Sequence, residues 1–249
     1  PIPSQTPVPT APIPRTPPVL PGTDQSSILN PNDLPRTYVT DSSQYLHTND
    51  RVLRPVIETV GAIELPLDRD YFSSLVSAII AQQISGQAAK TIEGRFRALF
   101  GPDRPFTPVH VASVSREELR SVGLSGQKTT YILDLAERVA GGLNLHDLPS
   151  MGDDEVISRL LPVKGIGRWT AEMFLIFSLG RLDVLPVDDM GLRTAVMRTY
   201  GLQHLPKKAD LVDLAEPWRP FRTVATLYLW RSLGVMAKDA AETHRVHET

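Results

Sequence analysis

The chain of 249 residues contains no cysteine. The absence of thiols excludes disulfide bonds, thiolate-bound zinc, cysteine-ligated iron–sulfur clusters and a cysteine nucleophile. Long apolar runs are missing as well, because the run at residues 75–81 is far shorter than the about 20 residues that cross a bilayer. No secretory signal is recognisable at the first residues. We therefore expect an intracellular protein without a membrane segment or an iron–sulfur cofactor.

An excess of charge of one sign is also missing. The chain carries 26 basic and 28 acidic residues, for a formal net charge of -2. This balance does not by itself indicate a nucleic-acid partner, so any positive field toward DNA must be local. Sustained alternation of apolar and polar residues, which would predict a sheet, is absent too.

Proline is concentrated at one end of the chain. Residues 1–35 hold half of the 22 prolines, together with Ser, Thr and Gln and few large apolar residues. Such a segment cannot bury enough apolar surface to offset its ordering entropy. We expect residues 1–40 to form a proline-rich flexible arm, either a partner-docking segment or a tail without a role. Within it, residues 36–40 can make one strand at most.

The remainder, residues 41–249, is predicted to be one helical domain. From about residue 50 the apolar residues recur with helical spacing, and glycines close several of the segments. The predicted helices are 51–63, 71–84, 85–100, 116–122, 128–140, 153–161, 168–179, 190–200, 209–215 and 221–233. The expected fold class is therefore all-α, with short helices and short loops.

The most informative segment is a glycine turn between two of these helices. Gly165 and Gly167 lie in the sequence LPVKGIGRWTA at residues 161–171, and Asp188 and Asp189 follow about twenty residues later. Glycine lets the backbone approach a bulky partner, and a helix N-terminus attracts a phosphate. An acidic side chain near a predicted phosphate-binding turn would repel the phosphate, so its presence indicates a catalytic role rather than binding alone.

These segments resemble the helix-hairpin-helix DNA glycosylase superfamily, and within it the 3-methyladenine DNA glycosylase II (AlkA) branch. The matching segments are KGIGRWTA at 164–171, PVDDMGLR at 186–193, IIAQQIS at 79–85, GLSGQK at 123–128 and YLW at 228–230. The resemblance covers most of residues 55–235. It implies two helical subdomains with the active site in the cleft between them, and a DNA-binding hairpin at about residues 155–179.

The resemblance assigns the catalytic role to Asp189. Cleavage of an N-glycosidic bond builds positive charge on the sugar, which a fixed carboxylate stabilises while it orients or deprotonates the attacking water. Asp188 is then a pocket neighbour, and the alternative is that one of the two acids only caps the following helix. Strand-nicking members of the superfamily carry a lysine where this chain has Trp169, so the resemblance implies a monofunctional enzyme.

The resemblance places Trp169 and Trp230 in the base pocket, with Met173 where the family often has tyrosine. Alkylated purines such as 3-methyladenine and 7-methylguanine carry positive charge, which an indole face attracts by about 0.5–2 kcal/mol. Core packing is the alternative role for Trp230, because leucines surround it in the sequence.

Contacts with DNA are expected mainly from the backbone around the glycine turn, with charge from two basic side chains. The resemblance places at Gln83 the wedge that fills the gap left by an extruded base, although the two glutamines can also be ordinary helix surface. The predicted DNA-binding residues are Lys164, Gly165, Gly167, Arg168, Thr170, Gln82, Gln83, Ser85, Ser125, Gly126 and Lys128.

Together these features predict a DNA glycosylase that removes alkylated bases from double-stranded DNA. The expected cofactors are none, except a monovalent cation at the carbonyls of Leu161, Val163 and Ile166. We expect a monomer in the cytoplasm, on the nucleoid. The alternatives are a non-catalytic helix-hairpin-helix protein that recognises DNA structure, which needs neither Asp189 nor the tryptophans, and a glycosylase for deaminated or oxidised bases.

Overall fold

The computed structural model describes residues 36–101 and 106–247, and every regular element within them is a helix. The elements are α1 (Arg36–Asn49), α2 (Leu53–Val60), α3 (Tyr71–Ala81), α4 (Gly86–Ala98), α5 (Pro108–Ser113), α6 (Arg116–Ser121), α7 (Gly126–Ala140), η2 (Leu145–Ser150), α8 (Asp153–Leu160), α9 (Arg168–Phe177), α10 (Met190–Thr199), α11 (Lys208–Leu214), η3 (Glu216–Trp218) and α12 (Arg222–His247). The predicted all-α fold class is confirmed. None of the helices in these two ranges is long and apolar enough to cross a membrane.

The first helix corrects one prediction. Residues 36–40 are not a strand but the first turns of α1. The expectation of a flexible arm with at most one strand is therefore wrong at these residues, because tertiary packing overrides their local preference. Leu46 of α1 is fully buried, and Tyr45 packs edge-on against Phe221 with ring centroids 5.2 Å apart. The helical part thus begins at Arg36, and residues 1–35 of the predicted arm lie outside the described residues.

Side-chain caps determine where the helices around the glycine turn begin. Ser85 starts α4 by accepting a first-turn N–H at 3.3 Å, and Ser125 starts α7 by accepting one at 3.2 Å. Asp189 starts α10 in the same way, at 2.6 Å. Each cap satisfies an N–H group that has no partner within its helix, which typically contributes about 1 kcal/mol.

Some helix boundaries differ from the prediction. Helix α3 ends at Ala81, three residues before the predicted end, because Gln83 adopts a left-handed backbone with φ +58° that no helix continues through. Helix α5 is absent from the prediction, since its six residues are too few to show a helical period. Helix α12 continues past residue 233 to His247.

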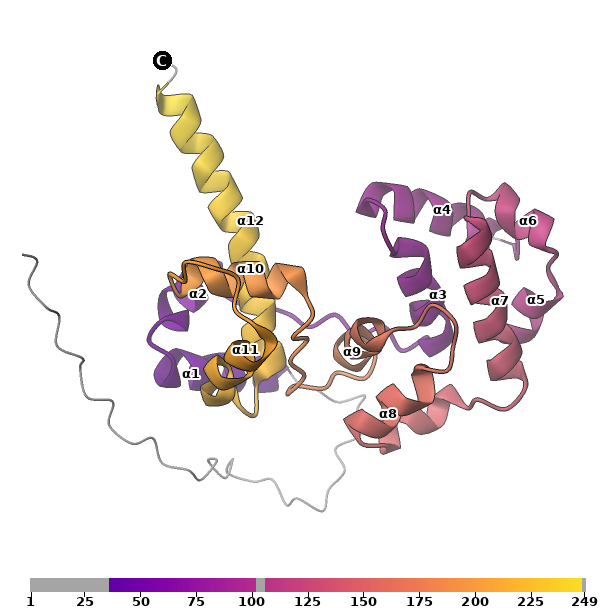
Figure 1. Cartoon of the computed structure of the whole chain (residues 1–249), viewed down its shortest axis with the longest axis horizontal. Helices are drawn as coiled ribbons and strands as arrows, with labels where there is room; N and C mark the ends of the chain where they lie inside the picture. The colour runs from indigo at the N-terminus through magenta and orange to yellow at the C-terminus, as the bar shows by residue number, and fades with distance from the viewer. Residues whose placement is uncertain (1–35, 102–105, 248–249) are drawn as a thin grey trace, which may run out of the picture.

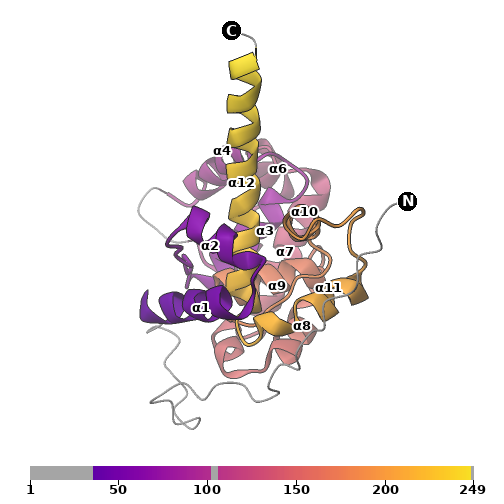
Figure 2. The same cartoon turned by 90° about the vertical axis from the view of Figure 1, so that its left-hand side faces the viewer.

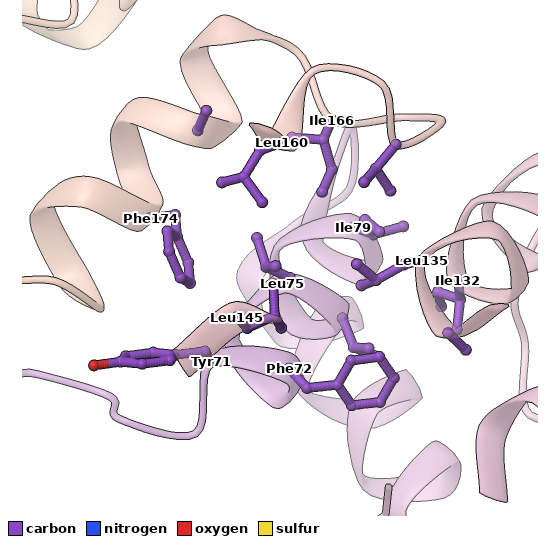
Figure 3. Close-up of a cluster of buried hydrophobic side chains, with 14 of the residues drawn as sticks. Tyr71, Phe72, Leu75, Ile79, Ile132, Leu135, Leu145, Leu160, Ile166 and Phe174 are labelled. Carbon is purple, nitrogen blue, oxygen red and sulfur yellow. The ribbon is translucent and has the colours of Figure 1, made fainter. Parts of the chain in front are cut away.

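Helices α3 to α9 surround one hydrophobic core, and we call this part the hairpin lobe. Leu75 and Ile79 of α3 are fully buried at its centre, and Figure 3 shows them between Phe174 of α9 and Leu135 of α7. Burial of each such side chain contributes roughly 1.5–3 kcal/mol. The shared core therefore fixes α7 and α9 relative to α3.

The helices nearest the two ends of the chain, α1, α2, α10, α11 and α12, surround a second core, which we call the terminal lobe. Trp218 is fully buried there, and its indole N–H donates to Asp50 at 2.8 Å. Figure 1 shows the two lobes side by side, with α9 at the edge of the hairpin lobe that faces the terminal lobe, and Figures 1 and 2 show the last turns of α12 extending past the other helices.

The lobes meet at two aromatic side chains that pack against both cores. Phe177 ends α9 and Trp230 lies in α12, and their rings stack with centroids 6.2 Å apart and planes 17° from parallel. In addition, Arg222 of α12 donates to Asp183, in the segment between α9 and α10, at 2.7 Å. This junction brings the start of α10 next to the start of α9.

Candidate active site

Helices α8 and α9, with the turn between them, form the predicted hairpin. Gly165 has φ +81°, and a Cβ there would overlap the ring of Tyr131, so only glycine fits. The N–H groups of Gly165 and Gly167 donate to no atom of the described residues. The first-turn N–H groups of α9, including that of Thr170, lack an intrahelical partner by their position. The turn thus presents donors at a helix N-terminus, which suits a phosphate.

The carboxylate of Asp189 accepts N–H groups from three helices. Its Oδ1 accepts the N–H of Leu192 in α10 at 2.6 Å and the indole N–H of Trp230 in α12 at 2.8 Å. Its Oδ2 accepts the indole N–H of Trp169 in α9 at 2.9 Å. Because donors from separate elements hold both oxygens, the carboxylate is fixed in one orientation at the junction of the lobes.

The two tryptophans approach this carboxylate from opposite lobes. Trp169 lies in the first turn of α9, and 42% of its surface is exposed. Trp230 is half-buried, because its ring stacks on Phe177 while its N–H reaches Asp189. Trp230 therefore combines the core-packing role with a position at the site. The structure brings together the predicted catalytic acid and both predicted pocket tryptophans.

Gly191 makes room for this arrangement, and the sequence analysis did not identify it. A Cβ on Gly191 would lie 3.1 Å from Oδ1 of Asp189 and 3.4 Å from the indole nitrogen of Trp230. The first distance is shorter than an ordinary contact, so the carboxylate would have to shift by a few tenths of an ångström, whereas the second is an ordinary van der Waals contact. The signal in the sequence is a glycine within the first turn of a helix, two residues after Asp189.

The other two predicted pocket residues make different contacts. Asp188 is exposed and forms an ion pair with Lys208 of α11. The cap of α10 is Asp189, so Asp188 does not fill the capping role considered for it. Met173 is half-buried and packs against the core of the hairpin lobe.

The two basic side chains of the hairpin that were predicted to bind DNA are paired with acids. The backbone N–H of Lys164 donates to Asp134 of α7 at 3.0 Å, and the ammonium lies 3.2 Å from the same carboxylate. Burial raises the pKa of Asp134, but bonds from Lys164 and Arg138 outweigh it and hold the pKa below its ordinary value. Arg168 donates to Glu172 at 3.1 Å. The side chains of Lys164 and Arg168 are still more than half exposed, so their charges are open to a phosphate.

Several other predicted DNA-binding residues cap helices or make hydrogen bonds within the protein. Gln82 donates its side-chain N–H to the carbonyl of Gly165 at 2.8 Å, whereas Gln83 is exposed. Ser85 and Ser125 are the helix caps described above, and Gly126 is the first residue of α7. The ammonium of Lys128 turns inward and donates to two backbone carbonyls at the end of α3.

Glu172 is a buried acid that the sequence analysis did not identify. It is 3% exposed, and its Oε2 has no hydrogen-bond partner among the described residues. Burial raises its pKa above the ordinary value, Arg168 partly offsets this, and the charges of Asp188 and Asp189 add to the rise. Arg168 and Glu172 also line a cavity of about 590 Å³ beside α8 and α9. An acid one turn after a basic residue, in an otherwise apolar helix, was the available signal.

Comparison with known proteins identifies the family. Residues 76–220 match the HhH-GPD superfamily of base excision DNA repair proteins. DNA-3-methyladenine glycosylase 1 of Schizosaccharomyces pombe is 34% identical over 166 residues, which cover 66% of this chain and 73% of that protein. DNA-3-methyladenine glycosylase 2 of Escherichia coli is 27% identical over 208 residues, which cover 78% of this chain and 71% of that protein.

Solved structures show the same architecture. The crystal structure of a DNA-3-methyladenine glycosidase from Bacillus halodurans matches with a TM-score of 0.71 and 39% identity, over 83% of this chain and 93% of that one. The 3-methyladenine DNA glycosylase Mag1 of S. pombe, in complex with abasic DNA, matches with a TM-score of 0.69 and 31% identity, over 77% of this chain and 95% of that one. The chain belongs to the HhH-GPD superfamily of base excision DNA repair proteins.

Proposed function

We propose that this protein is a monofunctional DNA glycosylase that hydrolyses the N-glycosidic bond of alkylated bases in duplex DNA and leaves an abasic site. The substrate class is that of 3-methyladenine and 7-methylguanine, because the similar proteins are named for 3-methyladenine removal. The observation that carries the proposal is the carboxylate of Asp189, fixed beside the exposed indole of Trp169.

Asp189 would stabilise the charge that develops on the sugar as the base departs. A carboxylate already oriented by its donors needs no reorganisation at that moment, and such preorganised groups commonly contribute a few kcal/mol to lowering the barrier. Its Oδ1 is occupied by two N–H groups, whereas Oδ2 is bonded only to Trp169 among the described residues. We therefore assign to Oδ2 the contact with the sugar or the attacking water.

Water would complete the reaction, because the position after Gly-Ile-Gly-Arg holds Trp169 in place of the lysine of strand-nicking relatives. An indole nitrogen forms no Schiff base with the sugar. The abasic product would therefore stay unbroken until another agent cleaves it.

The positive charge of an alkylated base would contribute to its selection. An electron-rich indole face attracts a cationic alkylated purine more strongly than a neutral base, by about 0.5–2 kcal/mol. Trp169 is the exposed indole at the site, so we assign this contact to it. The bias is small, and the weakened glycosidic bond of an alkylated purine supplies the rest of the selectivity.

The hairpin would hold one phosphate of the damaged strand. The N–H groups of Gly165 and Gly167 point to no other acceptor in the described residues, and Lys164 and Arg168 add positive charge at the edge. These local charges compensate for the net charge of -2 of the whole chain.

Gln83, not Gln82, is the residue we assign to the gap left by the extruded base. The side chain of Gln82 is bonded to the carbonyl of Gly165, whereas that of Gln83 is exposed at a turn next to the hairpin. A side chain in that position can enter the stack without breaking a bond within the protein.

A monovalent cation in the hairpin is part of the proposal. The carbonyls of Leu161 and Ile166 accept no hydrogen bond within the described residues, and that of Val163 accepts one, from Ile166 at 3.1 Å. Carbonyl oxygens suit a hard cation, and we assign these three as its ligands. Its charge would add to the attraction of the hairpin for a phosphate.

The test is release of free base from methylated duplex DNA, followed by analysis of strand breaks with and without alkali. We expect 3-methyladenine and 7-methylguanine to be released, with breaks only after alkali. Strand breaks without alkali would contradict the monofunctional mechanism. DNA binding without release of any base would favour the non-catalytic alternative, and size-exclusion chromatography of the same preparation would test the predicted monomer.

A further inference from the structure

Residues 82–84, which we call the wedge turn, join α3 to α4 in an unusual conformation. Gln83 at its centre has φ +58° and is the one residue other than glycine with a positive φ in the described part of the chain. Residues with a side chain rarely adopt a positive φ, because the Cβ then lies too close to the following carbonyl oxygen. Such a conformation persists only where surrounding contacts hold it in place.

Lys128 supplies contacts of this kind. Its ammonium donates to the carbonyl of Ile80 at 2.7 Å and to that of Gln82 at 2.6 Å. Both carbonyls lie at the C-terminal end of α3, where carbonyls have no intrahelical partner and the helix dipole attracts a cation. The two bonds therefore fix the backbone immediately before Gln83.

The same face of α7 supports the hairpin. Tyr131 follows Lys128 by one turn of α7, and its ring packs against Gly165. The side chain of Gln82 donates to the carbonyl of Gly165 at 2.8 Å and joins the wedge turn to the hairpin. Helix α7 thus contacts both the wedge turn and the glycine turn of the hairpin, the two turns that would face DNA, and sets the spacing between them.

We propose that Lys128 is a positioning residue for base extrusion, which acts by holding the wedge turn so that Gln83 faces the DNA. Its ammonium is bonded to the protein at two points and is therefore not assigned a phosphate contact. The inference rests on the proposed function, in which Gln83 fills the gap left by the extruded base. It predicts an effect that depends on how difficult extrusion is.

The test compares Lys128→Met, which keeps the length of the side chain and removes its donors, on two DNA substrates. One duplex pairs 7-methylguanine with cytosine, and the other places it opposite an abasic-site analogue, where extrusion breaks no base pair. We expect base release from the paired substrate to fall about tenfold, and release from the unpaired one to fall less than about threefold. Lys128→Arg should restore most of the activity on the paired substrate, because a guanidinium offers donors to the same carbonyls.

Three further variants complete the design. Gln83→Ala should show the same dependence on pairing, and the double variant should be no slower than the slower single one, because both changes remove one function. Lys207→Met removes an exposed lysine at the start of α11 and serves as a control for the loss of charge.

Three results would overturn the inference while the wild type is active. These are an equal loss on both substrates, an unchanged rate on the paired substrate, and losses that multiply in the double variant. Absence of base release by the wild type on both substrates would instead overturn the proposed function, and the inference with it.

Discussion

The indole N–H of Trp169 donates to Oδ2 of Asp189 at 2.9 Å. This bond joins the first turn of α9, in the hairpin lobe, to the residue that begins α10, in the terminal lobe. A phosphate at the hairpin and a sugar at the acid would thus be held at a fixed separation. Such fixed geometry contributes to the rate because reacting groups need no further alignment.

Replacement of Trp169 should change the preference among bases. Trp169→Ala removes the indole face, and we expect release of cationic 7-methylguanine to fall about two- to thirtyfold more than release of a neutral base such as hypoxanthine. Trp169→Phe keeps an aromatic face but loses the donor to Asp189, so the preference should largely remain while both rates fall. Single-turnover rates on the two substrates measure this. Equal losses in Trp169→Ala would show that the indole does not select by charge.

Gly191→Ala should reduce catalysis without weakening DNA binding. The added Cβ would lie 3.1 Å from Oδ1 of Asp189, so the carboxylate must shift by a few tenths of an ångström. A misplacement of about 1 Å can cost about a hundredfold in rate, so this smaller shift should slow base release measurably but by less than about a hundredfold. Gly94→Ala in α4 is the matched control, because nothing lies within 4 Å of its Cβ. A Gly191→Ala variant with the rate of the wild type would contradict the assigned geometry.

Replacement of Gly165 should lower stability, whereas replacement of Gly167 should weaken DNA binding. Gly165→Ala combines a positive φ with overlap of the Tyr131 ring, and we expect it to lower the free energy of unfolding by about 2–4 kcal/mol. A Cβ on Gly167 meets no atom within 4 Å, so Gly167→Ala should unfold like the wild type and yet bind DNA more weakly. Thermal unfolding and a DNA titration separate the two effects. Equal losses of stability would contradict this account.

Glu172 should make stability depend on pH. Burial raises the pKa of Glu172 in the folded protein above its value in the unfolded chain, which is ~4.3. The wild type therefore loses stability as the pH rises from the unfolded pKa through the folded pKa. Glu172→Gln removes this loss, so its melting temperature should match the wild type near pH 4 and exceed it at pH 8. Glu155→Gln, at an exposed acid of α8, is the control. Lower stability of Glu172→Gln at pH 8 would mean that the pair with Arg168 outweighs burial.

The sequence predicted the parts of the molecule that depend on local signals. Helical periodicity and glycine stops located most helices, and the motifs around Gly165 and Asp189 located the hairpin and the acid. Residues 36–40 were expected to form at most one strand because their helix, α1, packs against α12 and the residue before it, which lie far away in sequence. The contacts of Lys128 with the end of α3 join residues 46 and 48 positions apart, so no local pattern reveals them.

In the proposed mechanism the carboxylate of Asp189 performs the chemistry. The most direct test is the single-turnover rate of 7-methylguanine release from duplex DNA by Asp189→Asn and by Asp188→Asn. Asparagine also caps helices, so the fold should persist in Asp189→Asn. We predict that this variant binds the duplex like the wild type and releases base about 10²–10³-fold more slowly. Asp188→Asn should stay within about threefold of the wild type, since its carboxylate pairs with Lys208. Wild-type rates in Asp189→Asn, or an equal loss in both variants, would contradict the account.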